Sequence, residues 1–433
     1  MVIDEELISG GIDEKILAEL IYRHEQGLDR MRRLRDYYLG RHDILARSRK
    51  SNASVNNRVV CNHAKYIVDM TQSYLVGNPV TYSAGEECDI EVLKNCYLIQ
   101  DIAALDAELE KNMSIFGKSY ELIYSDEYSM PKSAGLSPMN TFMVYARGVN
   151  EKPLFGVHYF RRRDIRGAVT GVCCTAADGR YIYTYQNDAD SYYNMELVKK
   201  EPHFFGGVPF IEYRNNDEGQ GDFEQLIPLI DAYNLLQSDR INDKEQFVDA
   251  FLFLTGIELD SEQAKKLREE RILMGYDGAS AQYLSKVMSE NDVEVLCEGI
   301  KKDIHRFAMV PDLSDESFGG NLSGVAIKYK LMGFEQHIRN KERAFAKSLR
   351  RRFELYNNFL SLKGSMDRVP IHKIDIVFTR NLPVNELEIS EMINNLSGIA
   401  SSETLLSRLS FVSDPKEEAE LARKEREEEG VLI

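Results

Sequence analysis

Two unusually long stretches with helical periodicity constrain the fold more than any other feature. The first runs from about Phe223 to Leu254, and a helix of that length reaches about 45 Å. The second runs from Val325 to about Leu362 and repeats apolar residues along one face. These residues are Leu331, Phe334, Ile338, Phe345, Leu349, Phe353, Tyr356 and Leu360. Helices this long exceed what a compact domain needs and favour a wall or a bundle.

The chain before residue 223 combines shorter helices with a β-rich module. Periodicity predicts helices over residues 13–39, 56–74 and 88–115. From residue 119 to about 213, short alternating runs predict an antiparallel module, with Asp178-Gly179 as a hairpin signal. A chain of 433 residues is long enough for two to four packing units. The sequence therefore predicts an α+β protein.

An insert, a shorter helix and a polar loop separate the two long helices. The insert, residues 256–288, contains the charged run Lys265 to Arg271 and several turn residues. A helix is expected from about Asp292 to Phe307, and Pro311 ends it. Residues 312–324 are polar and contain three glycines, so we expect a mobile loop there.

The second long helix is basic, and the chain after it becomes acidic. Residues 321–352 contain nine Lys or Arg against two Glu. A short strand is expected at Ile374 to Phe378, followed by helices beyond Val384. The Glu-rich tail from Lys416 to Glu429 is expected to be a solvated helix or disordered.

The overall charge and the cysteines limit the classes of function. A net charge of −16 argues against tight binding of nucleic acid, which needs a local excess of Lys and Arg. The six cysteines form no CxxC pair and are expected to be reduced, packed thiols in a reducing cytoplasm. No apolar run approaches the roughly 18 residues that cross a bilayer, and the acidic start lacks a basic region before an apolar stretch. We expect neither a signal peptide nor a membrane span.

Known catalytic motifs are missing from the sequence. Gly117-Lys118-Ser119 resembles the end of a phosphate-binding loop, but position 112, where the first glycine belongs, is Asn112. Gly117 also stands where a helix gives way to a strand, the reverse of the required order, so we interpret it as a turn. The eight histidines are scattered, and neither an HExxH nor a GxSxG motif occurs. We therefore expect no catalytic residue, no cofactor and no metal.

Several short stretches share a sequence pattern that is specific in combination. Near the N-terminus these are 37–42 (YYLGRH) with Ile44, 56–60 (NNRVV) with Asn62, and 67–69 (IVD) leading to 74–79 (YLVGNP). In the middle they are Val208-Pro209 before Asn215-Asn216, then 229–234 (LIDAYN), Ser238-Asp239, Phe247 and Asp249. Further on the stretch is 318–328 (FGGNLSGVAIK). Together they run over nearly the whole chain and resemble the portal proteins of long-tailed bacteriophages.

The resemblance implies a portal fold in which subunits form a ring, usually of twelve. In chain order its parts are N-terminal helices and a β-rich wing (1–222), a stem helix (223–255), a clip (256–289), a second stem helix (290–311), a tunnel loop (312–324), a long wing helix and return strand (325–383), and C-terminal crown helices with an acidic tail (384–433). The tail is short, so a large crown is not expected.

The resemblance also implies roles for particular residues. The residues expected to face DNA are Asp315, Ser317, Gly319, Gly320, Asn321, Ser323, Lys328 and Lys330. The clip residues expected to dock partners are Lys265, Lys266, Arg268 and Arg271. An acidic subunit suits this role, because a channel through which a polyanion slides cannot hold many phosphates at once.

The implied function is a channel at the capsid vertex for packaging and ejecting double-stranded DNA. The implied partners are further copies of the chain, the terminase large subunit, a head–tail adaptor protein, and the major capsid and scaffolding proteins. The protein is expected in the virion, in the host cytoplasm during assembly, and not in a membrane. Two rivals remain: a non-conducting capsid adaptor or minor head protein, which predicts no axial channel, and a nucleic-acid-processing enzyme, which predicts turnover of nucleotide or DNA.

Overall fold

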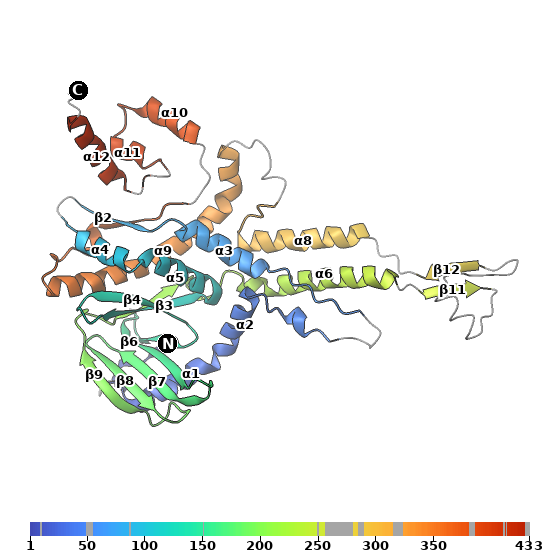
Figure 1. Ribbon diagram of the computed structural model, residues 1–433, viewed down its shortest axis with the longest axis horizontal. Coiled ribbons are helices and arrows are strands. Elements are labelled where there is room, and N and C mark those ends of the chain that lie inside the picture. The colour runs from blue at the N-terminus through green and yellow to red at the C-terminus, as the bar shows by residue number, and fades with distance from the viewer. Residues whose placement is uncertain are drawn as a thin grey trace. The chain divides into compact units, whose positions relative to one another are not determined.

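The chain forms two compact units, each assembled from separated stretches of sequence. The computed structural model describes residues 1–8, 11–48, 55–85, 88–149, 151–248, 251–255, 280–284, 290–314, 324–380, 386–409, 412 and 414–428. The first unit comprises Met1–Leu39, Ala64–Gln225 and Arg306–Ile433, and the second comprises Gly40–His63 and Leu226–His305. Both helices and strands are abundant (Figure 1), which confirms the predicted α+β class.

A six-stranded sheet, packed against a helix, forms one core of the first unit. In the order of the sheet its strands are β1 (Val2–Ile3), β5 (Thr141–Ala146), β6 (Pro153–Arg163), β7 (Val169–Ala177), β8 (Tyr181–Asn187) and β9 (Glu196–Pro202). All neighbours are antiparallel except β1 and β5. Helix α1 (Glu14–Gln26) buries Leu17, Leu20 and Ile21 in the same cluster as Phe142 and Phe155 of the sheet.

The hairpin predicted at Asp178-Gly179 is confirmed between β7 and β8. The Asp178 carboxylate accepts hydrogen bonds from the backbone N–H groups of Arg180 and Tyr181, both at 2.7 Å. An aspartate at this point of a turn satisfies backbone donors that the strands leave unpaired.

A second, three-stranded sheet lies between the six-stranded sheet and two helices. Its strands are β10 (Phe210–Arg214), β3 (Lys118–Ser125) and β4 (Pro131–Leu136), and its helices are α5 (Ile102–Phe116) and α9 (Gly324–Leu362). Phe210 and Tyr120 join Met143 and Ala177 in a core between the two sheets. Gly156 is required in this core, because a Cβ there would lie 2.2 Å from the Phe210 ring.

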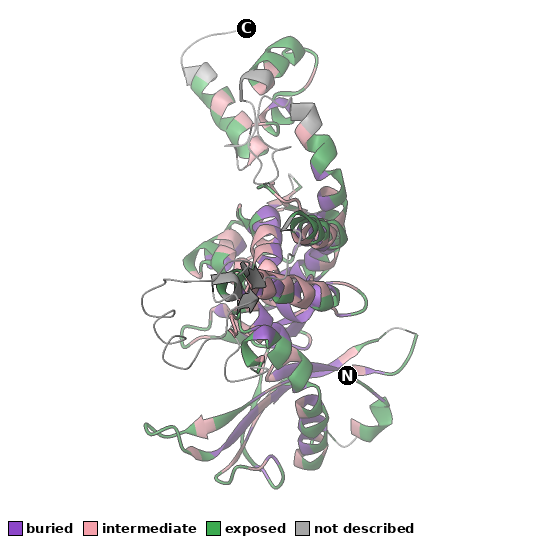
Figure 2. Cartoon of the chain, turned by 90° about the vertical axis from the view of Figure 1, so that its right-hand side faces the viewer, coloured by how far each residue is buried: buried purple, intermediate pink, exposed green. Residues whose placement is uncertain are grey.

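Helix α9 contributes its predicted apolar face to the first unit. All eight apolar residues predicted on this face are buried, and Figure 2 marks buried residues in purple.

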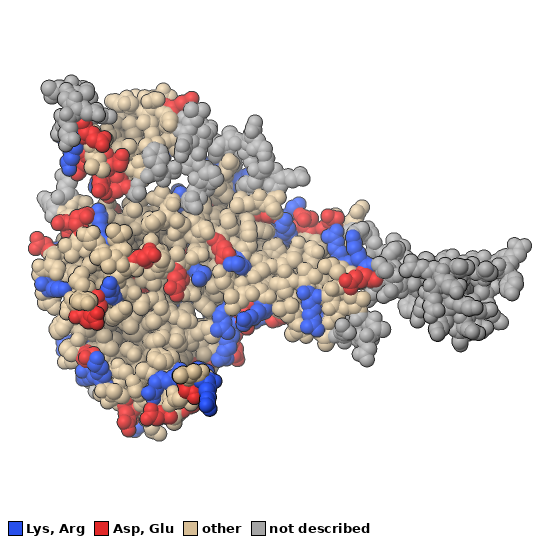
Figure 3. All heavy atoms as spheres, in the orientation of Figure 1, with Lys and Arg blue, Asp and Glu red and all other residues tan. Residues whose placement is uncertain are grey.

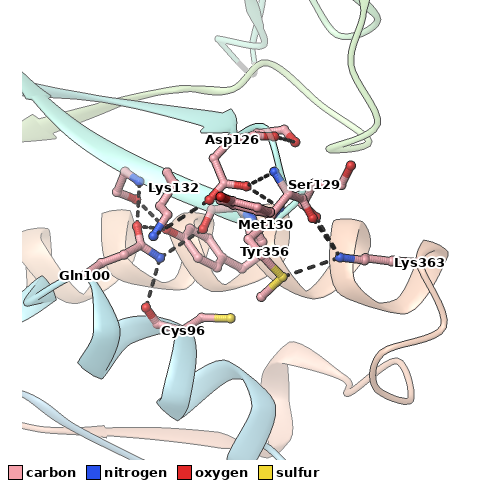
Figure 4. A network of polar contacts seen from close by, with 12 residues as sticks. Cys96, Gln100, Asp126, Ser129, Met130, Lys132, Tyr356 and Lys363 are labelled. Carbon is pink, nitrogen blue, oxygen red and sulfur yellow. Dashed lines mark hydrogen bonds and ion pairs between the residues drawn. The ribbon is translucent and has the colours of Figure 1, made fainter.

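Polar contacts hold the C-terminal end of α9, as Figure 4 shows. The Tyr356 hydroxyl contacts Ser133 Oγ at 2.9 Å and donates to Gln100 at 3.2 Å, while Lys363 donates to the Ser129 carbonyl at 3.0 Å.

An ionic cluster is buried where α9 meets α5 and β3. Arg352 Nε donates to Glu121 at 2.8 Å and Nη1 to Asp106 at 2.7 Å, while the Tyr213 hydroxyl donates to Glu121. All these side chains are almost fully buried. One guanidinium faces two carboxylates, so one negative charge is left in excess. Burial raises the pKa of Asp106 to about 6, although Arg352 acts to lower it.

We expect Asp106→Asn to remove a pH-dependent part of the stability. The folded pKa of Asp106, about 6, is higher than the value of about 4 in an unfolded chain. The stability due to this carboxyl is therefore present below about pH 4 and lost as pH rises through about 6, a change of up to about 3 kcal/mol. The measurement is a set of unfolding curves between pH 4 and pH 8. As pH rises, the free energy of unfolding of Asp106→Asn should increase relative to that of the unsubstituted protein.

A matched control is Asp29→Asn, because the Asp29 side chain is 90% exposed. It should leave the pH profile unchanged. Parallel profiles for Asp106→Asn and the unsubstituted protein would show that Asp106 keeps an ordinary pKa in the folded state.

The predicted N-terminal helices are shorter than expected. Residues 13–39 form α1 and α2 (Leu28–Tyr38), which are separated at Gly27, and residues 88–115 form α4 (Glu91–Ile99) and α5. The helix expected over 56–74 is α3 (His63–Val76), so its first seven residues are not helical. They are extended because side chains of another helix bind their backbone N–H groups.

The described residues after α9 include a strand and three α-helices. The expected strand is β13 (Ile374–Val377), which pairs antiparallel with β2 (Thr81–Ala84). The helices are α10 (Glu386–Leu396), α11 (Ser402–Leu406) and α12 (Pro415–Glu428). Of the two alternatives for the Glu-rich tail, the structure therefore shows the helix.

The described residues of the second unit include two α-helices and a two-stranded ribbon. Helix α6 (Ile227–Val248) leads to β11 (Phe251–Thr255), which pairs antiparallel with β12 (Ser280–Leu284), and α8 (Glu290–Ala308) follows. The prediction that the first stem helix extends to residue 254 or 255 is wrong. Phe251 to Leu254 is a continuous apolar run, and such a run fits a buried helix segment and a strand equally well.

Candidate functional site

Most residues predicted to face DNA or to dock partners lie outside the described part of the chain. These are Asp315, Ser317, Gly319, Gly320, Asn321 and Ser323 in the tunnel loop, and Lys265, Lys266, Arg268 and Arg271 in the clip. Their roles stay predictions. Lys328 and Lys330 are described, and both are exposed on the first turns of α9. Because they are two residues apart, their directions differ by about 160° around the helix.

The segment that leads into the predicted tunnel loop is anchored in the first unit. Met309 adopts a left-handed conformation with φ of 56° just after α8. The Tyr66 hydroxyl of α3 then donates to the Pro311 carbonyl at 2.8 Å. The Asp312 carboxylate accepts from the backbone N–H of Ser314 at 3.0 Å and from its hydroxyl at 2.6 Å. These contacts fix the point from which the loop departs.

Much of the basic charge of α9 is neutralised within the first unit. Lys341 is 2% exposed and donates to Glu110 at 2.8 Å and Asp222 at 2.7 Å. Burial acts to raise the pKa of Asp222, but Lys341 and His337 hold it below its usual range. Arg352 is buried with two carboxylates, and Arg339 and Arg351 pair with Glu335 and Glu354. The sequence count of nine positive residues therefore overstates the charge that α9 offers to a ligand. Figure 3 shows acidic and basic side chains interspersed over the visible face.

Helices α6 and α8 run antiparallel (Figure 1) and are linked at two levels, directly at one and through His63 at the other. Arg240 lies 3.6 Å from Glu294. At the other level, the His63 ring packs edge-on against Tyr233 and His305, with centroids 5.0 and 5.6 Å apart. Cys297 and Ile304 of α8 are buried.

A strap of extended chain, residues 55–62, is bound along α6. Alternate backbone N–H groups donate to side chains four residues apart on the helix: Asn57 to Asn242 Oδ1 at 2.7 Å, Val59 to Ser238 Oγ at 2.9 Å, and Cys61 to Asn234 Oδ1 at 2.8 Å. We call these three contacts the ladder. Four helical residues rise 6.0 Å and two extended residues about 6.6 Å, so the two spacings match.

The ladder gives a physical role to residues that carried the sequence resemblance. Asn57 and Val59 of the strap belong to one such stretch, and Asn234 and Ser238 to another. Reasoning from the sequence missed Asn242, the third side chain of the ladder. Three uncharged polar residues at positions i, i+4 and i+8, which lie on one face of the helix, were the signal that could have identified it.

Within the described residues, we find no group of three His, Cys, Asp or Glu side chains placed to hold a metal ion. No helix in the described ranges is long and apolar enough to span a membrane. All six cysteines are free thiols, and Cys96, Cys173, Cys174 and Cys297 are buried, as expected of packed thiols. Cys61 and Cys88 are partly exposed.

Comparison with known proteins identifies the class. The family model described as "Phage portal protein, SPP1 Gp6-like" matches residues 17–431. The chain therefore belongs to this family of phage portal proteins. The family is structural, and its members form oligomeric rings at the capsid vertex of the virion.

Two relatives show how far the similarity extends. The portal protein of Bacillus phage SPP1 is 28% identical over 426 residues, which cover 94% of this chain and 82% of that protein. The portal protein of Clostridium phage phiCD119 is 23% identical over 431 residues, which cover 90% of this chain and 91% of that protein. Among solved structures, a chain from the neck of an empty gene transfer agent particle has a TM-score of 0.49 and 12% identity, covering 79% of this chain and 88% of its own length.

Proposed function

We propose that twelve copies of this chain form a ring whose central channel conducts double-stranded DNA into the phage head during packaging and out of it during ejection. The observation that carries the proposal is the family match over residues 17–431, nearly the whole chain. The antiparallel pair α6 and α8 supports it, because long helices side by side can line a channel wall.

We assign the parts of the portal as the sequence resemblance implied, with one boundary moved. The wing contains the two larger sheets, α6 and α8 are stem helices, residues 312–324 are the tunnel loop, and α10 to α12 form the crown. The clip begins at Phe251 rather than at residue 256, because β11 and β12 pair as one ribbon.

We assign partner docking to the clip and no catalysis to this chain. The clip meets the terminase large subunit and later a head–tail adaptor, and the major capsid and scaffolding proteins surround the ring as it assembles in the host cytoplasm. The terminase supplies the energy for packaging. The assignment of no catalysis is supported at Gly117-Lys118-Ser119. Gly117 ends α5 with φ of 81° and Lys118 begins β3, so the chain passes from helix to strand. A phosphate-binding loop needs the opposite order, from strand to helix.

Electron microscopy of the purified protein tests the ring and its symmetry. We expect rings with a central hole and twelve subunits. A uniform monomer at high concentration, or a solid particle without a channel, would overturn the proposal and favour the adaptor. Turnover of nucleotide or DNA by the purified protein would contradict the absence of catalysis.

Tunnel-loop residues can be tested in infection assays. We expect replacement of residues 315–321 by a glycine-serine segment to leave rings intact and to impair packaging and DNA retention, because these polar groups would brush the DNA backbone. Normal packaging and retention would exclude the tunnel-loop assignment.

Lys328 and Lys330 should differ in their contribution to DNA binding. Each lysine that contacts a phosphate adds about one unit to the slope of log affinity against log salt. Because the two side chains project on nearly opposite sides of the helix, about 160° apart, we expect the double variant Lys328→Gln/Lys330→Gln to lose about one unit rather than two. The measurement is DNA binding by purified rings over a range of salt.

Lys199→Gln is the control for this experiment, since it removes one lysine charge, the number expected to contact DNA in the double variant, from an exposed position on β9. It should leave the slope unchanged. Equal slopes for the double variant and the unsubstituted ring would show that neither lysine meets DNA.

A further inference from the structure

The rotation of α6 about its axis is not set by an apolar stripe. Its apolar side chains are spread around most of the helix: Ile230 is fully buried, whereas Leu235, about 140° away around the helix, is 43% exposed. Without one apolar face, hydrophobic packing gives similar free energies to several rotations.

The ladder, by contrast, fits only one rotation. Asn234 and Ser238 are fully buried and Asn242 is 6% exposed, and all three accept hydrogen bonds from the strap. A shift of one residue would turn this face by about 100°. It would leave buried polar side chains and three backbone N–H groups without partners, which is costly.

The ladder side chains are themselves held in place. The Ser238 hydroxyl accepts from Val59 and donates to the Asn234 carbonyl at 2.7 Å. The Asn234 amide Nδ2 lies 2.8 Å from His42 Nδ1, and Asn242 Nδ2 donates to Asp239 at 3.3 Å. These bonds orient the oxygen of each ladder side chain toward the strap.

We propose that Asn234, Ser238 and Asn242 are positioning residues of the stem wall. They bind the main chain of the strap, set the rotation of α6, and thereby decide which α6 side chains face the strap and which remain exposed. The relevance of this positioning role to a channel wall rests on the proposed function. The ladder and its effect on α6 do not depend on that function, so the positioning role and the portal function can be disproved independently.

Hydrogen exchange with residue-level fragmentation tests the ladder in the full-length protein. Ser238→Ala should speed exchange of the Val59 amide roughly fivefold, the loss of one neutral hydrogen bond. The amides of Arg58 and Val60, which alternate with the ladder, serve as internal controls. Ser238→Thr keeps the hydroxyl and should restore protection, which a simple packing defect would not predict.

Thiol labelling tests the rotation itself. In separate proteins, Leu235→Cys should label fast and Ile230→Cys slowly, with peptide mapping to distinguish them from native cysteines. The three substitutions Asn234→Ala, Ser238→Ala and Asn242→Ala are then added to each cysteine variant. They should reduce the ratio of the two labelling rates at least several-fold. Circular dichroism should show that the helix persists. If the triple variant fails to fold, Ser238→Ala alone is used, and the same trend is expected.

The outcomes separate the two proposals. An unchanged ratio of labelling rates, with α6 intact, would overturn the positioning role whether or not rings conduct DNA. A changed ratio in a protein that forms no ring would support the ladder and count against the portal assignment.

Discussion

Replacing Arg352 by methionine should lower the free energy of unfolding by about 3–5 kcal/mol, the usual cost of removing one partner of a buried ion pair. Arg352 is fully buried and bridges Asp106 of α5 and Glu121 of β3. Methionine fills a similar volume but leaves both carboxylates without a cation. The measurement is chemical denaturation at neutral pH, where the uncompensated charges cost most.

Two further variants identify the cause of this loss. Arg352→Lys keeps the charge but cannot reach two carboxylates in a forked geometry, so we expect an intermediate loss. Adding Asp106→Asn and Glu121→Gln to Arg352→Met removes the stranded charges and should recover much of the stability. A loss below about 1 kcal/mol in Arg352→Met would mean that the cluster is hydrated or protonated rather than ionic.

Gly117→Ala should destabilise the first unit by about 2–5 kcal/mol. Alanine in a left-handed conformation costs roughly 1–2 kcal/mol, and overpacking adds about 1–3 kcal/mol. Gly117 has φ of 81°, and a Cβ there would lie 2.0 Å from the Gly219 carbonyl oxygen. The loop cannot easily retreat, because Asn215 donates its N–H to the Gly117 carbonyl at 3.0 Å. Thermal and chemical unfolding measure the effect.

Gly167→Ala is the matched control for Gly117→Ala. Its φ of 83° is nearly the same, but nothing lies within 4 Å of the Cβ position. It should lose only the conformational part, about 1–2 kcal/mol. Equal losses in the two variants would show that the loop around Gly219 moves aside.

Local pattern was sufficient wherever local interactions decide the structure. The apolar repeat of α9 and the turn at Asp178 depend on residues a few positions apart, and both were predicted correctly. The strap was missed because its conformation is decided by side chains about 180 residues away, on α6. The end of α6 was misplaced because β11 is defined by its pairing with β12, a distant segment.

The candidate site was reached in part. Resemblance pointed to the stretches that contain Asn57, Val59, Asn234 and Ser238 without giving them a role. Basic charge on α9 was counted correctly, but the sequence could not show that Lys341 and Arg352 are buried against carboxylates of α5, β3 and the segment around Asp222. Burial of a charge depends on tertiary neighbours, which periodicity along one helix does not reveal.

The ribbon of β11 and β12 has a consequence for the chain that joins its strands. Its strands pair over five positions, from Phe251 with Leu284 to Thr255 with Ser280, so the chain between them begins and ends at neighbouring points. Lengthening or exchanging such a segment adds only about 0.6 kcal/mol for each doubling of its length. The number of residues joining the two strands can therefore vary at little cost to the pairing of β11 with β12.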